Sequence, residues 1–208
     1  MSVFVCDPNI AQPLIQRRKA SGLDRYDEVW DGVYVMSPMA DNEHQGLATA
    51  MAAVLTSQID WKGRGRTLAG ANVSDRSENW TENYRVPDVL VFLTDCTAED
   101  RGSHWFGGPD FAVEIVSEGD RTFEKLDFYA KVGVRELLVI HRNPWQLTFF
   151  RQAAEGEPRL LEAAAEGDQI ETLASEVLRL KFQLDRSAKT IRVLDVDGLL
   201  IREIPIHG

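Results

Sequence analysis

The chain has 208 residues and carries 33 acidic and 23 basic side chains, so its formal net charge is −10 at pH 7. This length and an apolar content of 44% predict one folded domain, residues 1–208, and exclude an intrinsically disordered chain. The acidic balance also excludes the overall positive field that is typical of nucleic-acid-binding proteins. Any contact with DNA must therefore be local, or must depend on a bound cation.

The two cysteines predict a reducing environment. Cys6 and Cys96 are ninety positions apart, which fits neither a disulfide scaffold nor a zinc cluster, and we expect a cytoplasmic protein. Asp7 and Pro8 interrupt the short apolar start, so no signal peptide is expected. The longest uncharged stretch, His44–Ile59, is shorter than a membrane span and indicates a buried helix.

The first half of the chain predicts a helix, a hairpin and a second helix. Pro13–Ser21 is typical of a short surface helix or an ordered arm. Asp31-Gly32 lies between two β-rich runs and predicts a hairpin turn. Asp41–Gln58 has apolar residues at helical spacing, and either Asp41 or Asn42 can cap its start. After a basic loop, Thr67–Val73 is predicted to be a strand and the polar run Asn72–Tyr84 a loop or an irregular strand.

The second half predicts the central sheet and a β-rich tail. Strands are predicted at Val89–Leu93, Phe111–Val116, Glu136–His141 and Leu147–Arg151, the last of which is expected to pair with Arg159–Ala163 across a turn at Gly156. The connecting segments are predicted to be a loop at Asp95–Pro109 and a helix at Phe123–Lys131 that ends at Gly133. Asp197-Gly198 predicts a hairpin between Ile191–Val196 and Leu199–Ile204. The pattern predicts an α/β (α+β) fold with a mixed central sheet, flanking helices and β-hairpin additions at both ends.

Two carboxylates lie in, or directly before, strands that are otherwise apolar. Glu114 interrupts the strand Phe111–Val116, and Asp88 follows Pro87 at the start of Val89–Leu93. If the two strands are antiparallel neighbours, these carboxylates converge and form a hard-oxygen site suited to Mg²⁺ or Mn²⁺. The alternative is structural: Asp88 caps a loop, and Glu114 forms an ion pair with a basic residue such as Lys125 or Arg135.

A lysine follows on the next helix. Lys125 is eleven positions after Glu114, and a short turn returns its helix over the sheet edge. An ammonium there would hold an attacking water or neutralise charge in a transition state. The alternative is a solvated helical lysine paired with Glu124 or Asp127.

These residues resemble a known family of bacterial proteins. The order of Asp88, Glu114 and a helix leading into a parallel strand resembles the PD-(D/E)xK nuclease superfamily. Several blocks are similar to the restriction-endonuclease-like Uma-two family over roughly residues 15–150. These blocks are Glu28-Val-Trp-Asp-Gly32, Met36-Ser-Pro38, His44 at a helix start, Arg85-Val-Pro-Asp88, Val113-Glu-Ile-Val-Ser117, Asp120-Arg-Thr-Phe-Glu-Lys-Leu-Asp-Phe-Tyr129 and Gly133-Val-Arg-Glu-Leu-Leu-Val139.

The resemblance implies a restriction-endonuclease-like core and a metal-dependent endonuclease that hydrolyses DNA phosphodiester bonds. Asp88 and Glu114 would bind Mg²⁺ or Mn²⁺, and Lys125 would be the catalytic cation. His44 would orient water or contact phosphate, or would simply cap or pack at its helix start. The superfamily lysine is expected two residues after the glutamate, where this chain has Val116.

That departure supports an alternative, a catalytically inactive nuclease-fold module for binding or assembly. A C-terminal β-rich extension, about residues 151–208, is predicted beyond the core, and its segment Leu180–Ile206 is expected to form a homodimer. Weaker site candidates are Glu28, Ser117 and Tyr129, the last of which is expected mainly as core or site wall. DNA contact is expected to be weak or metal-gated, through Arg64, Arg66 and Arg121.

Overall fold

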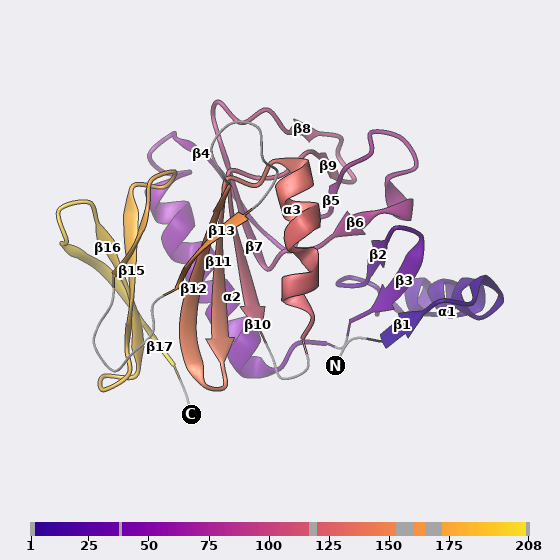
Figure 1. The fold of residues 1–208 in the computed structure, drawn as a ribbon, viewed down its shortest axis with the longest axis horizontal. Coiled ribbons are helices and arrows are strands. Elements are labelled where there is room, and N and C mark those ends of the chain that lie inside the picture. Colours follow the sequence, from indigo (N-terminus) through magenta and orange to yellow (C-terminus); the bar gives the residue numbers. More distant parts are fainter. Residues whose placement is uncertain (1–2, 38, 117–119, 153–159, 165–171, 207–208) are drawn as a thin grey trace.

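The computed structural model describes residues 3–37, 39–116, 120–152, 160–164 and 172–206. Three sheets lie side by side, with the N-terminal segment at one end of the molecule and the C-terminal sheet at the other (Figure 1). The described residues form a mixed α+β fold, as the sequence predicts. In this part of the chain, no helix is long and apolar enough to cross a membrane.

The central sheet has six strands in the order β13-β12-β11-β10-β7-β4. Its only parallel pair among the described strands is β10 with β11, which is connected through α3; the other pairs are antiparallel. The strands are β4 (Gly65–Ala69), β7 (Val89–Leu93), β10 (Phe111–Val116), β11 (Glu136–Arg142), β12 (Trp145–Gln152) and β13 (Leu160–Ala164).

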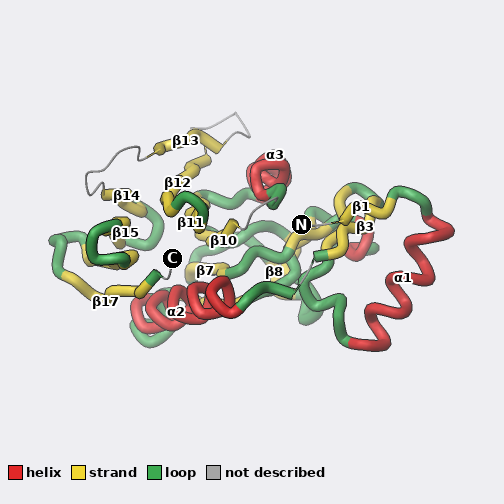
Figure 2. The backbone as a smooth tube through the Cα atoms, turned by 90° about the horizontal axis from the view of Figure 1, so that it is seen from below, coloured by secondary structure: helices red, strands yellow, loops and turns green. Residues whose placement is uncertain are grey.

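Helices cover the two faces of this sheet, α2 one face and α3 the other (Figure 2). The helix α2 (Asn42–Gln58) is capped by Asp41, whose side chain accepts from the backbone N–H of His44. A 3₁₀ turn at Thr122–Lys125 precedes α3 (Leu126–Val132). The helix ends at Gly133, whose φ of 87° is a left-handed conformation that suits glycine.

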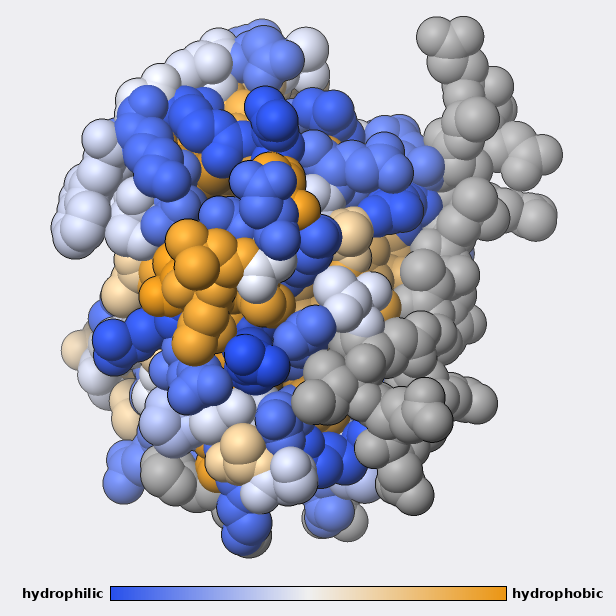
Figure 3. Space-filling view, turned by 90° about the vertical axis from the view of Figure 1, so that its left-hand side faces the viewer, coloured by the Kyte–Doolittle hydropathy of each residue, from blue (hydrophilic) through white to orange (hydrophobic). Residues whose placement is uncertain are grey.

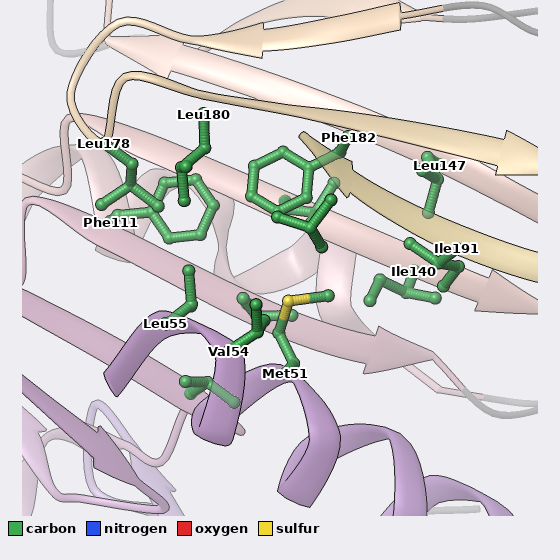
Figure 4. Close-up of a cluster of buried hydrophobic side chains, with 14 of the residues drawn as sticks. Met51, Val54, Leu55, Phe111, Ile140, Leu147, Leu178, Leu180, Phe182 and Ile191 are labelled. Atoms are coloured by element: carbon green, nitrogen blue, oxygen red, sulfur yellow. The ribbon is translucent and has the colours of Figure 1, made fainter. Parts of the chain in front are cut away.

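The C-terminal strands form a second sheet that packs beside α2 on the same face of the central sheet. One hydrophobic cluster joins Leu55 of α2, Phe111 of β10 and Phe182 of β15 (Figure 4). The tail is therefore part of the main core and not a separate appendage. The four strands are β14 (Thr172–Ser175), β15 (Leu180–Asp185), β16 (Thr190–Asp195) and β17 (Leu200–Pro205).

The outer side of the tail sheet is partly apolar. Val196, Leu199 and Leu200 at the β16–β17 hairpin are exposed, with Leu199 71% accessible. Figure 3 shows hydrophobic residues gathered on this side of the molecule and surrounded by hydrophilic ones. Strand β17 is at the edge of the tail sheet, so one side of its backbone lacks a β-sheet partner among the described strands.

The third sheet joins the N-terminal segment to the core. Its order is β1-β3-β2-β6-β5-β9-β8, and α1 (Pro8–Ser21) packs beside β1. Arg18 fixes α1 to the hairpin through an ion pair of 2.5 Å with the buried carboxylate of Asp27. The strands are β1 (Val3–Val5), β2 (Glu28–Trp30), β3 (Val33–Met36), β5 (Val73–Ser74), β6 (Tyr84–Arg85), β8 (Glu99–Asp100) and β9 (Trp105–Phe106).

The structure differs from the sequence prediction mainly where elements are short. The first helix begins five residues earlier than predicted, and the strand expected at Thr67–Val73 is shifted to Gly65–Ala69. Two-residue strands pair in the segment 95–109, which was predicted to be a loop. Both hairpin predictions are confirmed, because Asp31-Gly32 and Asp197-Gly198 connect paired strands. The expected turn at Gly156 lies outside the described residues.

Candidate active site

Asp88 and Glu114 are neighbours across two strands, as the sequence argument required. Strands β7 and β10 are antiparallel, and their register pairs Val89 with Val113. The same register places Asp88 opposite Glu114 one residue further along. Because residues directly opposite each other share a sheet face, the two carboxylates lie on the same side of the sheet end.

Asp88 is held by the backbone of the next strand and by the first core helix. Its Oδ2 accepts a hydrogen bond of 2.7 Å from the backbone N–H of Ile115. The same oxygen is 3.3 Å from Nε2 of His44, in the first turn of α2. Burial lowers the pKa of His44, but the hydrogen bond and charge of Asp88 outweigh this and raise it overall. Sequence reasoning therefore named two residues that the fold brings into contact.

Lys125 is an internal cation that bridges two carboxylates. Its Nζ is 3.1 Å from Oε1 of Glu114 and 3.0 Å from Oε1 of Glu28. All three side chains are buried. Burial favours the neutral amine, but the charges of Glu114 and Glu28 outweigh it and raise the pKa of Lys125 above its usual value. The alternative pairing of Lys125 with Glu124 or Asp127 is wrong, whereas the alternative pairing of Glu114 with Lys125 does occur.

Glu114 is also bound by the next turn of α3. The hydroxyl of Tyr129 donates to its Oε1. Tyr129 is fully buried, so it is both part of the core, as expected, and a direct partner of the site. Burial raises the pKa of Glu114 above its usual value, opposed by the ammonium of Lys125 and reinforced by the charges of Asp88 and Glu28. The site thus carries more negative charge than Lys125 alone neutralises.

Glu28 is positioned as firmly as the residues that the sequence favoured. Its Oε1 accepts from the backbone N–H of Val86 at 2.9 Å, and its Oε2 accepts from the indole N–H of Trp30 at 2.6 Å. The sequence made Glu28, on the hairpin, only a weaker candidate. The missed signal is its two-residue spacing from Trp30, which places both side chains on one face of β2.

These groups line one cavity of about 290 Å³ at the end of the central sheet. Its wall combines residues from β2, α2, the end of β4, the segment just before β7, β10 and the turn before α3. The charged lining residues and the histidine are Glu28, Asp41, His44, Asp88, Glu114, Asp120 and Lys125. Asp41 is paired with Arg142, so four carboxylates remain against one lysine and one histidine, and the cavity is suited to a cation.

The oxygen donors fit a hard divalent cation with few protein ligands. Mg²⁺ is commonly held by one or two carboxylates and keeps several waters, and Asp88 and Glu114 supply that pair. A group of three or more histidine, cysteine or acidic side chains arranged as a metal site does not occur among the described residues. Nδ1 of His44 is buried and has no hydrogen-bond partner there.

The other candidates lie elsewhere. Arg64 donates to the backbone carbonyl of Leu178, Arg66 forms an ion pair of 3.0 Å with Asp100, and Arg121 pairs at 2.5 Å with Glu124. None of the three lines the cavity described above. Ser117 lies outside the described residues.

Comparison with known proteins gives matches to one family and one fold. The family model described as "Uma2: Putative restriction endonuclease" matches residues 19–187. The structure is similar to the crystal structure of a protein from Anabaena variabilis ATCC 29413 described as a putative nuclease belonging to DUF820. The TM-score is 0.53 at 18% sequence identity, covering 71% of this chain and 80% of that chain. No curated protein matches this sequence.

Proposed function

Because the chain belongs to the Uma2 family of putative restriction endonucleases, we propose that it is a Mg²⁺- or Mn²⁺-dependent endonuclease that hydrolyses DNA phosphodiester bonds. One observation carries the proposal: Asp88, Glu114 and Lys125 line the same cavity, with Lys125 in direct contact with Glu114. Two carboxylates and an ammonium at the end of a sheet are the groups that phosphodiester hydrolysis needs.

The proposed roles follow from the contacts. Asp88 and Glu114 are the metal ligands, and the bound cation would lower the pKa of a water and stabilise charge on the phosphoryl oxygens. Lys125 provides a fixed positive charge beside the reacting phosphate and holds the attacking water. Tyr129 and Glu28 keep Glu114 and Lys125 in place. His44 contacts Asp88 through Nε2 and would orient a water or a phosphate oxygen beside this carboxylate.

A second candidate is a nuclease-fold binding or assembly module without catalysis. Val116 stands where the superfamily lysine is expected, and both carboxylate oxygens of Glu114 lie within 3.3 Å of the ammonium of Lys125. Metal binding at Glu114 therefore competes with this ion pair. In this version the cavity binds Mn²⁺, and no DNA is cut.

Cleavage and metal binding together test the two candidates. The wild type and Asp88→Ala are compared for Mn²⁺ binding by calorimetry and for cleavage of single-stranded and duplex DNA. Asp95→Ala is the matched control, because Asp95 is exposed and lines neither this cavity nor the proposed dimer interface. We expect Asp88→Ala to lose at least about 100-fold in rate, as for removal of one strongly stabilising group at a catalytic centre. Cleavage that Asp88→Ala leaves unchanged contradicts the proposal, and Mn²⁺ binding without cleavage supports the second candidate.

The proposed enzyme acts in the cytoplasm as a homodimer. Both cysteines are free, which agrees with a reducing compartment. The exposed apolar residues of the β16–β17 hairpin and the edge strand β17 support a two-fold interface there. Light scattering is expected to give a dimer mass that Leu199→Glu converts to a monomer, whereas Leu23→Glu, an exposed leucine on the N-terminal side, leaves it unchanged. A monomeric wild type contradicts this interface.

A further inference from the structure

A second and larger cavity adjoins the candidate active site. It encloses about 900 Å³ between the N-terminal segment and the loops around residues 70–72, 80–84 and 102–105. Gly70 lines both cavities, and Arg25 lines the second cavity while Tyr26 lines the first. The backbone N–H of Gly70 donates to the carbonyl of Asp88 at 3.1 Å. The wall between the cavities is therefore built on the backbone of a proposed metal ligand.

The shared wall has no room for a side chain. Gly70 has a φ of 64°, and a Cβ built on it would lie 3.1 Å from the ring of Tyr26. Both the left-handed backbone and the contact with the ring favour glycine at this position. The boundary between the two cavities is therefore the backbone at Gly70 packed against the ring of Tyr26.

Several aromatic rings line the second cavity. Trp80 stacks on His104 with ring centroids 5.0 Å apart and an interplanar angle of 11°. Tyr84 meets the edge of Trp80 at 5.1 Å. Trp105 stacks on Phe92 at 3.6 Å and also lines the cavity. Trp80, Tyr84 and Trp105 are only half-buried, so each ring keeps accessible surface after packing against its neighbour.

The charges in this cavity suit a neutral ring system and not a phosphate. Three basic and three acidic side chains line it, so their formal charges cancel; they are Lys19, Arg25, Arg66, Asp24, Glu82 and Asp100. Arg66 is paired with Asp100, and burial lowers the pKa of His104 and favours the uncharged imidazole. Gln12, Asn72 and Ser103 add polar groups to the lining. Aromatic faces with a few hydrogen-bonding groups are typical of nucleobase recognition.

We propose that the second cavity binds an unpaired nucleobase of the strand whose phosphate lies at Asp88 and Glu114, so that the protein's substrate is single-stranded DNA. A base inside a duplex has both faces covered by stacking and cannot reach these rings without leaving the helix. The volume lies within the range of small-molecule pockets and accommodates a nucleotide. The inference rests on the proposed nuclease function for the position of the phosphate.

The test measures binding, so that it does not depend on turnover. Fluorescence anisotropy compares labelled single-stranded and duplex oligodeoxynucleotides of one sequence, with phosphorothioate linkages to slow hydrolysis, with and without Mn²⁺. We expect tighter binding of the single strand. Trp80→Ala should weaken it by about five-fold or more, the effect of losing one stacked base. Trp61→Ala is the matched control, because Trp61 is 80% exposed and lies outside the cavity.

A second pair of variants covers the case in which Trp80→Ala does not fold. Thr81 is exposed and lines the cavity, so Thr81→Glu adds a carboxylate without removing a ring, and Thr81→Gln is its neutral control. We expect Thr81→Glu to weaken single-strand binding more than Thr81→Gln does. Equal affinity for single strand and duplex, no binding to either, or folded Trp80 and Thr81 variants that bind as the wild type does would each overturn the inference. Trp80-dependent binding of the single strand without any cleavage would support the nucleobase site and contradict the hydrolytic function. Cleavage of duplex DNA without preference for the single strand would support the hydrolytic function and contradict the nucleobase site.

Discussion

The ammonium of Lys125 lies 3.0 Å from Glu28, a residue 97 positions earlier in the chain and on a different sheet from Glu114. The two glutamates hold the lysine between the N-terminal hairpin and the central sheet. The hairpin therefore completes the candidate active site, and the orientation of Lys125 depends on how the hairpin is attached.

Glu28→Gln is expected to reduce cleavage by about 10-fold or more, mainly through kcat, because Lys125 loses one of its two carboxylates. It should also lower the free energy of unfolding by about 1–3 kcal/mol, the cost of weakening a buried charged hydrogen bond. Both effects are measured on one preparation, by initial rates and urea unfolding. Glu78→Gln, at an exposed position, should change neither value, and a fully active Glu28→Gln would show that this contact does not position Lys125.

Phe182→Ala is expected to destabilise the whole protein by about 3–5 kcal/mol, as for other fully buried phenylalanines. Phe182 stacks on Phe111 with ring centroids 5.8 Å apart, and neither ring is accessible to solvent. Urea unfolding followed by tryptophan fluorescence should keep one transition and shift its midpoint down. Leu23→Ala, at a position 51% exposed and outside the proposed dimer interface, should cost less than about 0.5 kcal/mol. A separate low-stability transition for the tail would contradict the shared core.

Asp41→Asn is expected to lower stability at neutral pH but not in acid. The guanidinium of Arg142, at 2.8 and 3.0 Å, and the N–H of His44 hold the pKa of Asp41 below its usual value. A depressed folded pKa stabilises the protein fully above the unfolded value of about 3.9, and this contribution is lost as the pH falls through the folded value. Asparagine still caps the helix, so the difference reports the charge.

Thermal unfolding at pH 7 and near pH 2.5 measures this difference between wild type and Asp41→Asn. Because the carboxylate of Asp41 is mostly exposed, we expect no more than about 1 kcal/mol at pH 7 and almost none in acid. Asp197→Asn, in the exposed hairpin turn, should show no such change with pH. A difference that grows in acid would reverse the predicted sign.

Cys6 is expected to react with thiol reagents well before Cys96 at pH 8. Burial raises the pKa of Cys96 to about 11, so little thiolate is present, whereas Cys6 is exposed. Mass spectrometry of the alkylated protein should show the modification first at Cys6, and Cys6→Ser should remove this early product. Raising the pH toward 10 should increase the alkylation rate of Cys96 by more than unfolding of the protein at that pH explains. Equal initial alkylation rates of the two cysteines at pH 8 would contradict the burial of Cys96.

The sequence was sufficient for features that depend on one strand or one turn. Glu114 was identified because a carboxylate in an apolar strand requires a partner, and Asp88 because it opens the neighbouring strand. The two Asp-Gly turns fixed both hairpins. The sequence argument assumes that the strands that follow Asp88 and contain Glu114 are antiparallel neighbours, which brings the two carboxylates together. The antiparallel pairing of β7 with β10 confirms this assumption.

What the sequence could not supply depends on contacts between distant segments. Glu28 pairs with Lys125 only because the hairpin packs against the turn before α3, and no local pattern reports that packing. The short strands within 73–106 are stabilised by pairing with one another and carry little β periodicity of their own. The sequence predicts that the tail is β-rich, but its burial against α2 depends on tertiary packing that no local pattern reports.

The shared core also constrains the order of events during synthesis. The apolar face of α2, near residue 55, is covered in part by Ile204 and its neighbours, about 150 positions later in the chain. A ribosome completes the first helices and the central strands well before it releases the covering strands. The nascent chain therefore exposes this apolar surface of α2 until the strands that cover it have been synthesised and have folded.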